Sequence, residues 1–264
     1  MISIEIQRPG ARKPLKRELP SSFDELTAAK LVFWAQCVLS NLPFREALRR
    51  IAFRFSGIPI WYYSKLTRTQ QMAIEEAYEW LAKPYRMEKW LINELRPLGR
   101  RFVGPGHRMM NMTSDEFSEC DRFFNLYRQN KDRRDLNKML ACMYRPANGG
   151  TPNDPRRPFY SGEVSTRAFW MRFIPMRIRY AVFLNYIGVR ELMPQKFKNI
   201  FSSSNEQRAN KYGWPGLIIE MAGAKIGNVK EVEKYTIWNL LFIAERNEEM
   251  RIESERNKRA HGKD

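Results

Sequence analysis

The chain has 264 residues, of which 43% are hydrophobic and 13% aromatic, so it is too rich in aromatic residues for a disordered protein and long enough to bury a sizeable core. Its 46 lysines and arginines outnumber 29 aspartates and glutamates, which gives a net charge of +17 at pH 7. This surplus favours a polyanionic partner such as nucleic acid, an acidic protein surface or an anionic membrane, although it is equally compatible with a role in solubility alone.

The cysteines and the apolar segments indicate a protein of the cell interior. Cys37, Cys120 and Cys142 are odd in number and far apart, which argues against a disulfide framework and against a zinc site. Residues 1–10 lack the apolar core of a signal peptide. The longest nearly apolar stretch, residues 180–189, is too short to span a bilayer. We therefore expect reduced thiols, no membrane span and an intracellular location.

The first half of the chain begins with a strand pattern and continues with helical patterns. Residues 2–6 alternate apolar and polar side chains, and residues 16–19 are a candidate second strand, so a small N-terminal hairpin is predicted. Ser21 or Ser22 is a suitable N-cap for a helix that reaches about Ser40. Further predictions in this half are a helix from Pro43 to Gly57, an extended or buried loop at 58–63, a helix at 67–81, a helix around Trp90 to Leu95, and a loop from Pro97 to Gly106.

The second half opens on the sequence Thr113-Ser-Asp-Glu116, which is typical of a capping box. Aromatic residues then recur at helical spacing up to Tyr127. Helices are also predicted at 132–144, 165–173 and 176–191, the last two being either separate or one helix kinked at Pro175. The remaining predictions are loops at 146–158 and 194–204, a turn at 212–216, and a last helix that starts near Val229 and becomes highly charged beyond Glu245.

These elements predict a mainly α fold, with a multi-helix globular body and a small N-terminal β-hairpin. The glycine- and arginine-rich loop that ends near Met112 is the candidate boundary between two parts, residues 1–98 and 113–264. One interlocked domain is the alternative.

No constellation typical of an enzyme is visible. The two histidines, His107 and His261, lie in a basic loop and in the charged tail. There is no HExxH, P-loop, GxGxxG or GxSxG sequence, and Asp154 with Arg156 and Arg157 predicts only an exposed ion pair. We therefore expect no catalytic residue, no metal and no cofactor.

Two groups of arginines and one aromatic pair are the candidate interface or polyanion-binding residues. Arginine pairs with phosphate and aromatic rings stack on bases, but an amphipathic helix or a packed core explains the same composition more simply. The arginines are Arg96, Arg100, Arg101 and Arg108 in the loop and Arg167, Arg172, Arg177 and Arg179 near the later helices; the aromatic pair is Trp61 and Tyr62.

Several segments carry a family resemblance. They are residues 19–27, 112–117, 144–146 and 179–184, the single residues Asp121, Phe124, Tyr127, Leu136 and Leu140, and the Asp154-x-Arg156 unit. The C-terminal segments, which carry the likeness to tail-assembly proteins, are Gly213-Trp214, Gly227-Asn228 and residues 231–233 and 238–241. In these segments the chain resembles uncharacterised structural-module proteins of tailed bacteriophages and prophages, and it is loosely similar to tail-assembly proteins. The resemblance implies no site residues.

The resemblance implies a virion structural or assembly protein, associated with tail, neck or capsid, that acts through protein–protein contacts. Its partners would be other virion or assembly proteins, with packaged DNA as a further candidate, and a place in a ring or shell would make it an oligomer. It would lie in the host cytoplasm during assembly and then in the virion if it is retained there. The alternative is a nucleic-acid-binding protein that uses the basic patches.

Overall fold

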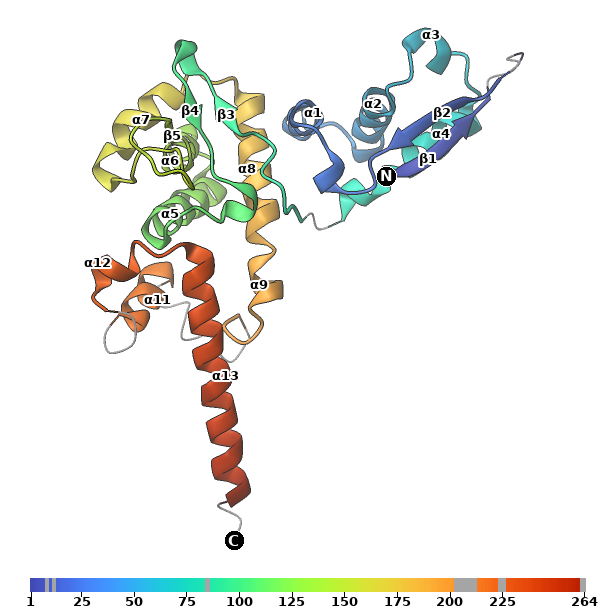
Figure 1. Ribbon diagram of the computed structural model, residues 1–264. Coiled ribbons are helices and arrows are strands. Elements are labelled where there is room, and N and C mark those ends of the chain that lie inside the picture. The colour runs from blue at the N-terminus through green and yellow to red at the C-terminus, as the bar shows by residue number, and fades with distance from the viewer. Residues whose placement is uncertain (8–9, 11–12, 84–85, 202–212, 223–226, 262–264) are drawn as a thin grey trace. The chain divides into compact units, whose positions relative to one another are not determined.

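The computed structural model describes residues 1–7, 10, 13–83, 86–201, 213–222 and 227–261 (Figure 1). Helices dominate, and a two-stranded antiparallel sheet lies near the N-terminus, which confirms the expected mainly α fold with its hairpin. The chain forms two compact units. The first contains Met1–Ile92 and Pro175–Val189, and the second contains Asn93–Ile174 and Arg190–Asp264.

The hairpin of the first unit pairs β1 (Ile2–Ile6) with β2 (Leu15–Leu19) in antiparallel register. The side chains of Ile6 in β1 and Leu19 in β2 are buried, whereas most polar residues of the two strands are exposed. The alternation of residue types therefore fixes which face of the hairpin meets the helices.

The helices of the first unit follow the hairpin closely along the chain. They are α1 (Ala28–Leu39), α2 (Phe44–Ser56), α3 (Ile60–Tyr63) and α4 (Arg68–Glu76). The helix expected from residue 21 or 22 starts at Ala28, because Phe23–Glu25 form a separate 3-10 turn and the Thr27 side chain caps α1. Gly57 ends α2 with a left-handed φ of 63°, as the sequence predicts.

The predictions for residues 58–63 and 67–81 need correction. Residues 60–63, expected to be extended or loop, form a helical turn, because Pro59 has a suitable φ for the residue that precedes a helix. The helix expected at 67–81 stops at Glu76, and a 3-10 helix, Glu79–Ala82, follows it.

The helix α8 (Met176–Arg190) joins the first unit although it comes from the second half of the sequence. The Gly188 carbonyl accepts a hydrogen bond from the Met87 amide at 3.0 Å. The Asn185 side chain accepts from the Leu91 amide at 2.7 Å and donates to the Lys89 carbonyl at 3.0 Å. The helix predicted around Trp90 to Leu95 is therefore wrong, because the backbone at Lys89 and Leu91 bonds to α8 and Glu94–Leu95 pair with another strand.

The second unit is built on α5 (Ser114–Asn130), α6 (Arg133–Met143) and α7 (Val164–Met171). The predictions for all three hold within a few residues, and Asp132 caps α6. A small antiparallel sheet has the order β3 (Glu94–Leu95), β4 (Phe102–Val103) and β5 (Arg145–Pro146). It ties the loop after α6 to the segment that precedes α5.

The C-terminal part of this unit contains α9 (Met193–Lys196), α11 (Gly213–Met221), α12 (Val229–Val232) and α13 (Ile237–His261). The predicted last helix is broken between α12 and α13, because Thr236 bridges to Thr113 and the Ile237 amide donates to the Met112 carbonyl. Residues 213–216, predicted as a turn, are the first residues of α11; residue 212 lies outside the described residues, as do 202–204 of the predicted loop at 194–204.

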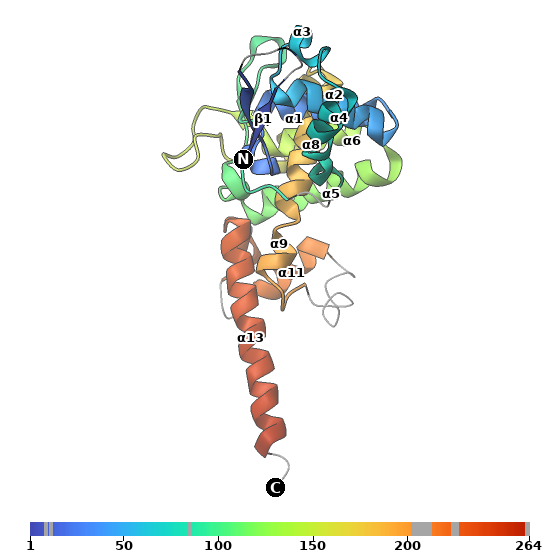
Figure 2. The same cartoon turned by 90° about the vertical axis from the view of Figure 1, so that its right-hand side faces the viewer.

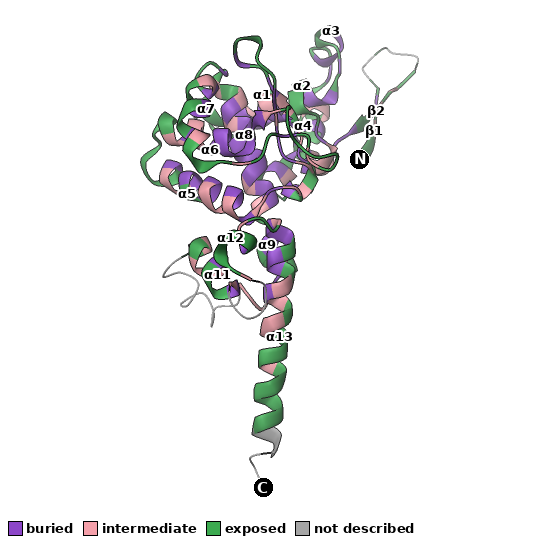
Figure 3. Cartoon of the chain, turned by 60° about the vertical axis from the view of Figure 1, so that its left-hand side comes forward, coloured by how far each residue is buried: buried purple, intermediate pink, exposed green. Residues whose placement is uncertain are grey.

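The long helix α13 changes character along its length. Its first turns contain the buried residues Ile237, Leu240 and Leu241, whereas residues 249–251 and 253–258 are exposed (Figure 3). Figure 2 shows α13 running well past α9 and α11. The charged half expected beyond Glu245 is thus a continuous helix with an exposed second half.

The sequence predicts two domains, residues 1–98 and 113–264, and this division stays a prediction. The compact units meet near Ile92 and Asn93 in the sequence, and α8 returns to the first unit.

Candidate interaction surface

The predicted arginines fall into groups with different surroundings. Arg167 is buried on α7, where its Nε donates to the Ala141 carbonyl and its Nη1 meets the Glu163 carboxylate, each at 2.9 Å. Its hydrogen bonds join α7 to α6. This arginine therefore packs the second unit together and is not placed to bind a partner.

Arg96 and Arg101 are exposed and share one carboxylate. Both contact Glu94 of β3, Arg101 through its Nε at 2.6 Å. The hydrogen bonds from Arg96 and Arg101 hold the pKa of Glu94 below its usual value. One glutamate thus offsets two positive charges on this edge of the small sheet.

Arg100 and Arg172 instead lie over aromatic rings. The Arg100 guanidinium carbon is 3.9 Å from the centre of the Trp170 ring. That of Arg172 is 4.0 Å from Phe169 and 4.7 Å from Phe173. Both arginines are exposed, and neither guanidinium forms an ion pair within the described ranges. The negative faces of these rings attract the cations, but no carboxylate among the described residues neutralises them.

The rings under these arginines are themselves partly open to solvent. Phe169 and Phe173, one helical turn apart, are 47% and 39% exposed, and Trp170 is half-buried between them. The turn at Pro97–Gly99 contacts α7, and its Leu98 is 67% exposed and has a left-handed φ of 48°. We call Leu98, Arg100, Phe169, Trp170, Arg172 and Phe173 the arginine–aromatic surface.

The structure thus brings one arginine from each of the two predicted groups to the same cluster of aromatic rings. Arg100 from the loop and Arg172 from the later helices reach the same cluster of rings. Arg108 is half-buried, and its carbonyl accepts from Trp238 in α13. Arg177 is exposed and Arg179 is buried on α8, in the first unit.

The predicted aromatic pair is divided between surface and core. Trp61 is 58% exposed on α3. Tyr62 is buried, and its hydroxyl donates to the Ile6 carbonyl at 3.0 Å. Only Trp61 faces a potential partner, while Tyr62 attaches the helical turn to the hairpin.

A buried ionic cluster was not anticipated from the sequence. Glu116 accepts from Arg156 at 2.8 Å and from Arg145 at 2.9 Å, and Asp154 accepts from the Nε of Arg156 at 2.8 Å. Asp154 and Arg156 do form the expected ion pair, but the expectation that it is exposed is wrong, because Arg156 is 1% exposed. Arg157 meets Glu163 instead, at 3.5 Å.

The cluster also changes the predicted capping box. The Thr113 hydroxyl accepts from the Glu116 amide at 3.2 Å, as expected. The Glu116 carboxylate points to the two arginines, so the cap is formed from one side only. Burial raises the pKa of Glu116, and the charges of Arg156 and Arg145 oppose that rise. Two acids and two arginines balance here, which suits a structural clamp between α5 and the loop after β5.

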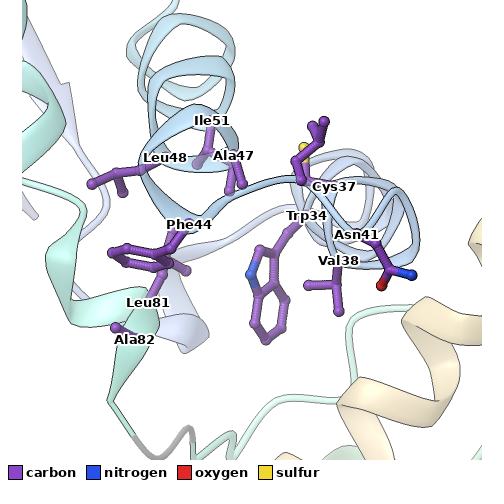
Figure 4. Close-up of a pocket in the computed structure, with 11 residues that line it drawn as sticks. Trp34, Cys37, Val38, Asn41, Phe44, Ala47, Leu48, Ile51, Leu81 and Ala82 are labelled. Carbon is purple, nitrogen blue, oxygen red and sulfur yellow. The ribbon is translucent and has the colours of Figure 1, made fainter.

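The first unit contains an apolar hollow of about 520 Å³ (Figure 4). Figure 4 shows the side chains of α1 on one side and those of α2 and the Glu79–Ala82 helix on the other. Trp34 and Phe44 line it, and its polar groups are the Asn41 amide and the Cys37 thiol. Burial raises the pKa of that thiol. The lining contains no carboxylate, histidine or lysine, so it supplies no acid–base pair.

Within the described part of the chain, no three acidic, histidine or cysteine side chains gather as metal ligands would. No helix among the described residues is long and apolar enough to cross a membrane. Searches of protein-family models, of characterised proteins and of solved structures find no match to this chain.

Proposed function

We propose that this protein is a structural or assembly component of a tailed-bacteriophage particle and that it acts through contacts with a tail, neck or capsid protein. It performs no reaction of its own in this role. The phage assignment is supported by the resemblance in residues 19–27, 112–117 and 179–184, and the mode of action is supported by the surface of the first unit.

The observation that carries the proposal is the exposure of two large apolar side chains on α3. Ile60 is 71% exposed and Trp61 is 58% exposed, side by side on one helical turn. The same turn is held by the buried side chains of Tyr62 and Tyr63. Large apolar residues on a fixed turn are typical anchors of protein interfaces, because they lose little conformational freedom on binding.

The exposed half of α13 is a second element suited to contacts. Arg251 pairs with Glu248 and with Glu255, each at 2.5 Å, so the helix is supported by its own ion pairs. Met250 is 49% exposed in this half. A helix of this kind offers a surface to a neighbouring subunit without needing to fold on binding.

The first test is a mass-spectrometric inventory of purified particles and of infected-cell lysate. The proposal expects this protein in the particle, in a ratio to the capsid protein that matches a ring or shell. An assembly factor would instead be found in the lysate in complex with a virion protein. Absence from both the particle and every virion-protein complex would rule the proposal out.

A second test asks whether α3 makes the contact. A photoreactive amino acid at position 61 is expected to cross-link to one virion protein, because Trp61 is exposed on the proposed contact. Position 72 is the matched control, since Met72 is also an exposed apolar residue of the first unit, on α4. Equal cross-linking from both positions would contradict a specific contact at α3.

A further inference from the structure

We infer that the arginine–aromatic surface of the second unit binds single-stranded nucleic acid, with the guanidinium groups of Arg100 and Arg172 on phosphates and the rings of Phe169 and Phe173 against bases. This binding goes beyond the proposed role in protein–protein contacts and involves residues of the other unit.

The local charge favours a polyanion. Residues 93–112 and 155–175 contain eight arginines and two glutamates, and no lysine. Both glutamates are already shared, Glu94 by Arg96 and Arg101 and Glu163 by Arg157 and Arg167. Among the residues that the structure describes, Arg100 and Arg172 thus pair with no acid that would have to be displaced before a phosphate binds.

The stacking of these arginines prepares them for phosphate. A guanidinium that lies on a ring has its plane fixed, while its N–H groups at the edge stay free to donate. The Trp170 ring holds Arg100 in this way at 3.9 Å, and Phe169 holds Arg172 at 4.0 Å. Less side-chain freedom is then lost on binding than for a solvated lysine.

The exposed rings distinguish a single strand from a duplex. Phosphate contacts alone serve both forms, because both have the same backbone charges. The bases of a duplex are stacked on each other, whereas those of a single strand are free to stack on aromatic side chains. Phe169 and Phe173 meet edge to face at 5.6 Å, so their faces point in different directions and part of each is solvent-exposed.

The experiment is a titration of the full chain against a labelled oligothymidylate of about 20 nucleotides, a duplex of equal length and a labelled polyglutamate, followed by fluorescence anisotropy. The oligothymidylate is expected to bind more tightly than the duplex. Its affinity should fall steeply between about 50 and 200 mM salt.

Two double variants separate charge from stacking. Arg100→Gln with Arg172→Gln should weaken binding at least tenfold and reduce the salt slope by about 1.4, the value for two single-strand phosphates. Phe169→Leu with Phe173→Leu keeps apolar side chains but removes the rings. It should weaken single-strand binding about tenfold and duplex binding much less, because the duplex loses only the support that these rings give to Arg172.

The charge-matched control is Arg133→Gln with Arg134→Gln. These two arginines of α6 are exposed in the same unit, and their side chains form no hydrogen bond, ion pair or ring contact with described residues. Their loss should change the affinity less than twofold. Circular dichroism of each variant, matching that of the unmodified chain, excludes loss of folding as the cause.

Three results would overturn the inference. One is the lack of oligothymidylate binding at low salt. Another is an equal effect of the Arg133/Arg134 and Arg100/Arg172 variants, which would indicate non-specific attraction to a basic protein. The third is tighter binding of polyglutamate with the same dependence on Arg100 and Arg172, which would assign the surface to an acidic protein partner.

Discussion

The guanidinium group of Arg156 lies 2.8 Å from the carboxylate of Glu116, and neither side chain has any solvent-exposed surface. The partners are 40 residues apart, one in the first turn of α5 and the other in the loop after β5. Arg145 at 2.9 Å and Asp154 complete the cluster. Because every charge has an opposite partner, the cluster holds the loop without leaving a buried charge unpaired.

Removing one carboxylate should break this balance. Glu116→Gln leaves Arg145 and Arg156 with Asp154 as the remaining acid of the cluster, and a buried charge that loses its partner costs about 3–5 kcal/mol. The expected result is a fall of that size in the free energy of unfolding, measured by urea denaturation. Glu119→Gln, which loses an ion pair with the exposed Arg122, is the control and should cost less than about 1 kcal/mol. Equal losses in the two variants would contradict the structural role of the cluster.

A second polar centre joins three residues of the second unit, Asp121, Arg190 and Trp214. The Asp121 carboxylate on α5 accepts from Arg190 at 2.7 Å and from the Trp214 indole at 2.9 Å. Asp121→Ala should release both groups and lower the free energy of unfolding by about 3 kcal/mol. Hydrogen exchange of 213–221 should accelerate more than in Trp214→Phe, which removes one contact only. Unchanged exchange in α11 would show that Asp121 does not hold this helix.

The close contact of α8 with the segment at Met87 predicts an intolerant glycine. A Cβ at Gly188 would lie 2.7 Å from the Met87 Cγ and 3.2 Å from its amide nitrogen. Alanine is favoured over glycine in a helix by about 1 kcal/mol, but the forced displacement should cost about 1–3 kcal/mol. Gly188→Ala is thus expected to lower the melting temperature. Gly162→Ala, where a Cβ meets nothing within 4 Å, should leave it unchanged. A rise in the melting temperature of Gly188→Ala would contradict this packing.

The three cysteines should resist alkylation in the native protein. Burial raises the pKa of the Cys142 thiol well above its usual value and also raises the pKa of Cys37. The thiolate is the reactive form, so labelling should increase with pH, and the raised pKa moves that increase to higher pH than for a free cysteine. Cys37, which lines the hollow, should react first, and Cys142 should react only as the second unit unfolds. Mass spectrometry at pH 8 with and without urea measures this order. Rapid native labelling of Cys142 would refute it.

Local residue patterns were sufficient for much of the fold. The alternation at residues 2–6 predicts a strand, and Asp132 and Gly57 mark where helices begin and end, because these signals act within a few residues of the backbone they affect. The helix predicted around Trp90 failed for the opposite reason. Its amides bond to Asn185 and Gly188, about a hundred residues away, and nothing in the local sequence indicates that partner.

The arginine–aromatic surface was likewise predictable from the sequence only in part. Composition alone identified arginines and aromatics as the residues of interest, because their number and charge are properties of the sequence. Which of them stays exposed depended on packing: Arg167 turns inward to the Ala141 carbonyl, whereas Arg172 lies on Phe169 at the surface. The sequence by itself determined the helical fold, the basic charge and the residue types of the site. The tertiary structure decided which arginines meet acids, carbonyls or rings, because ion pairs and stacking depend on distances between segments far apart in the chain.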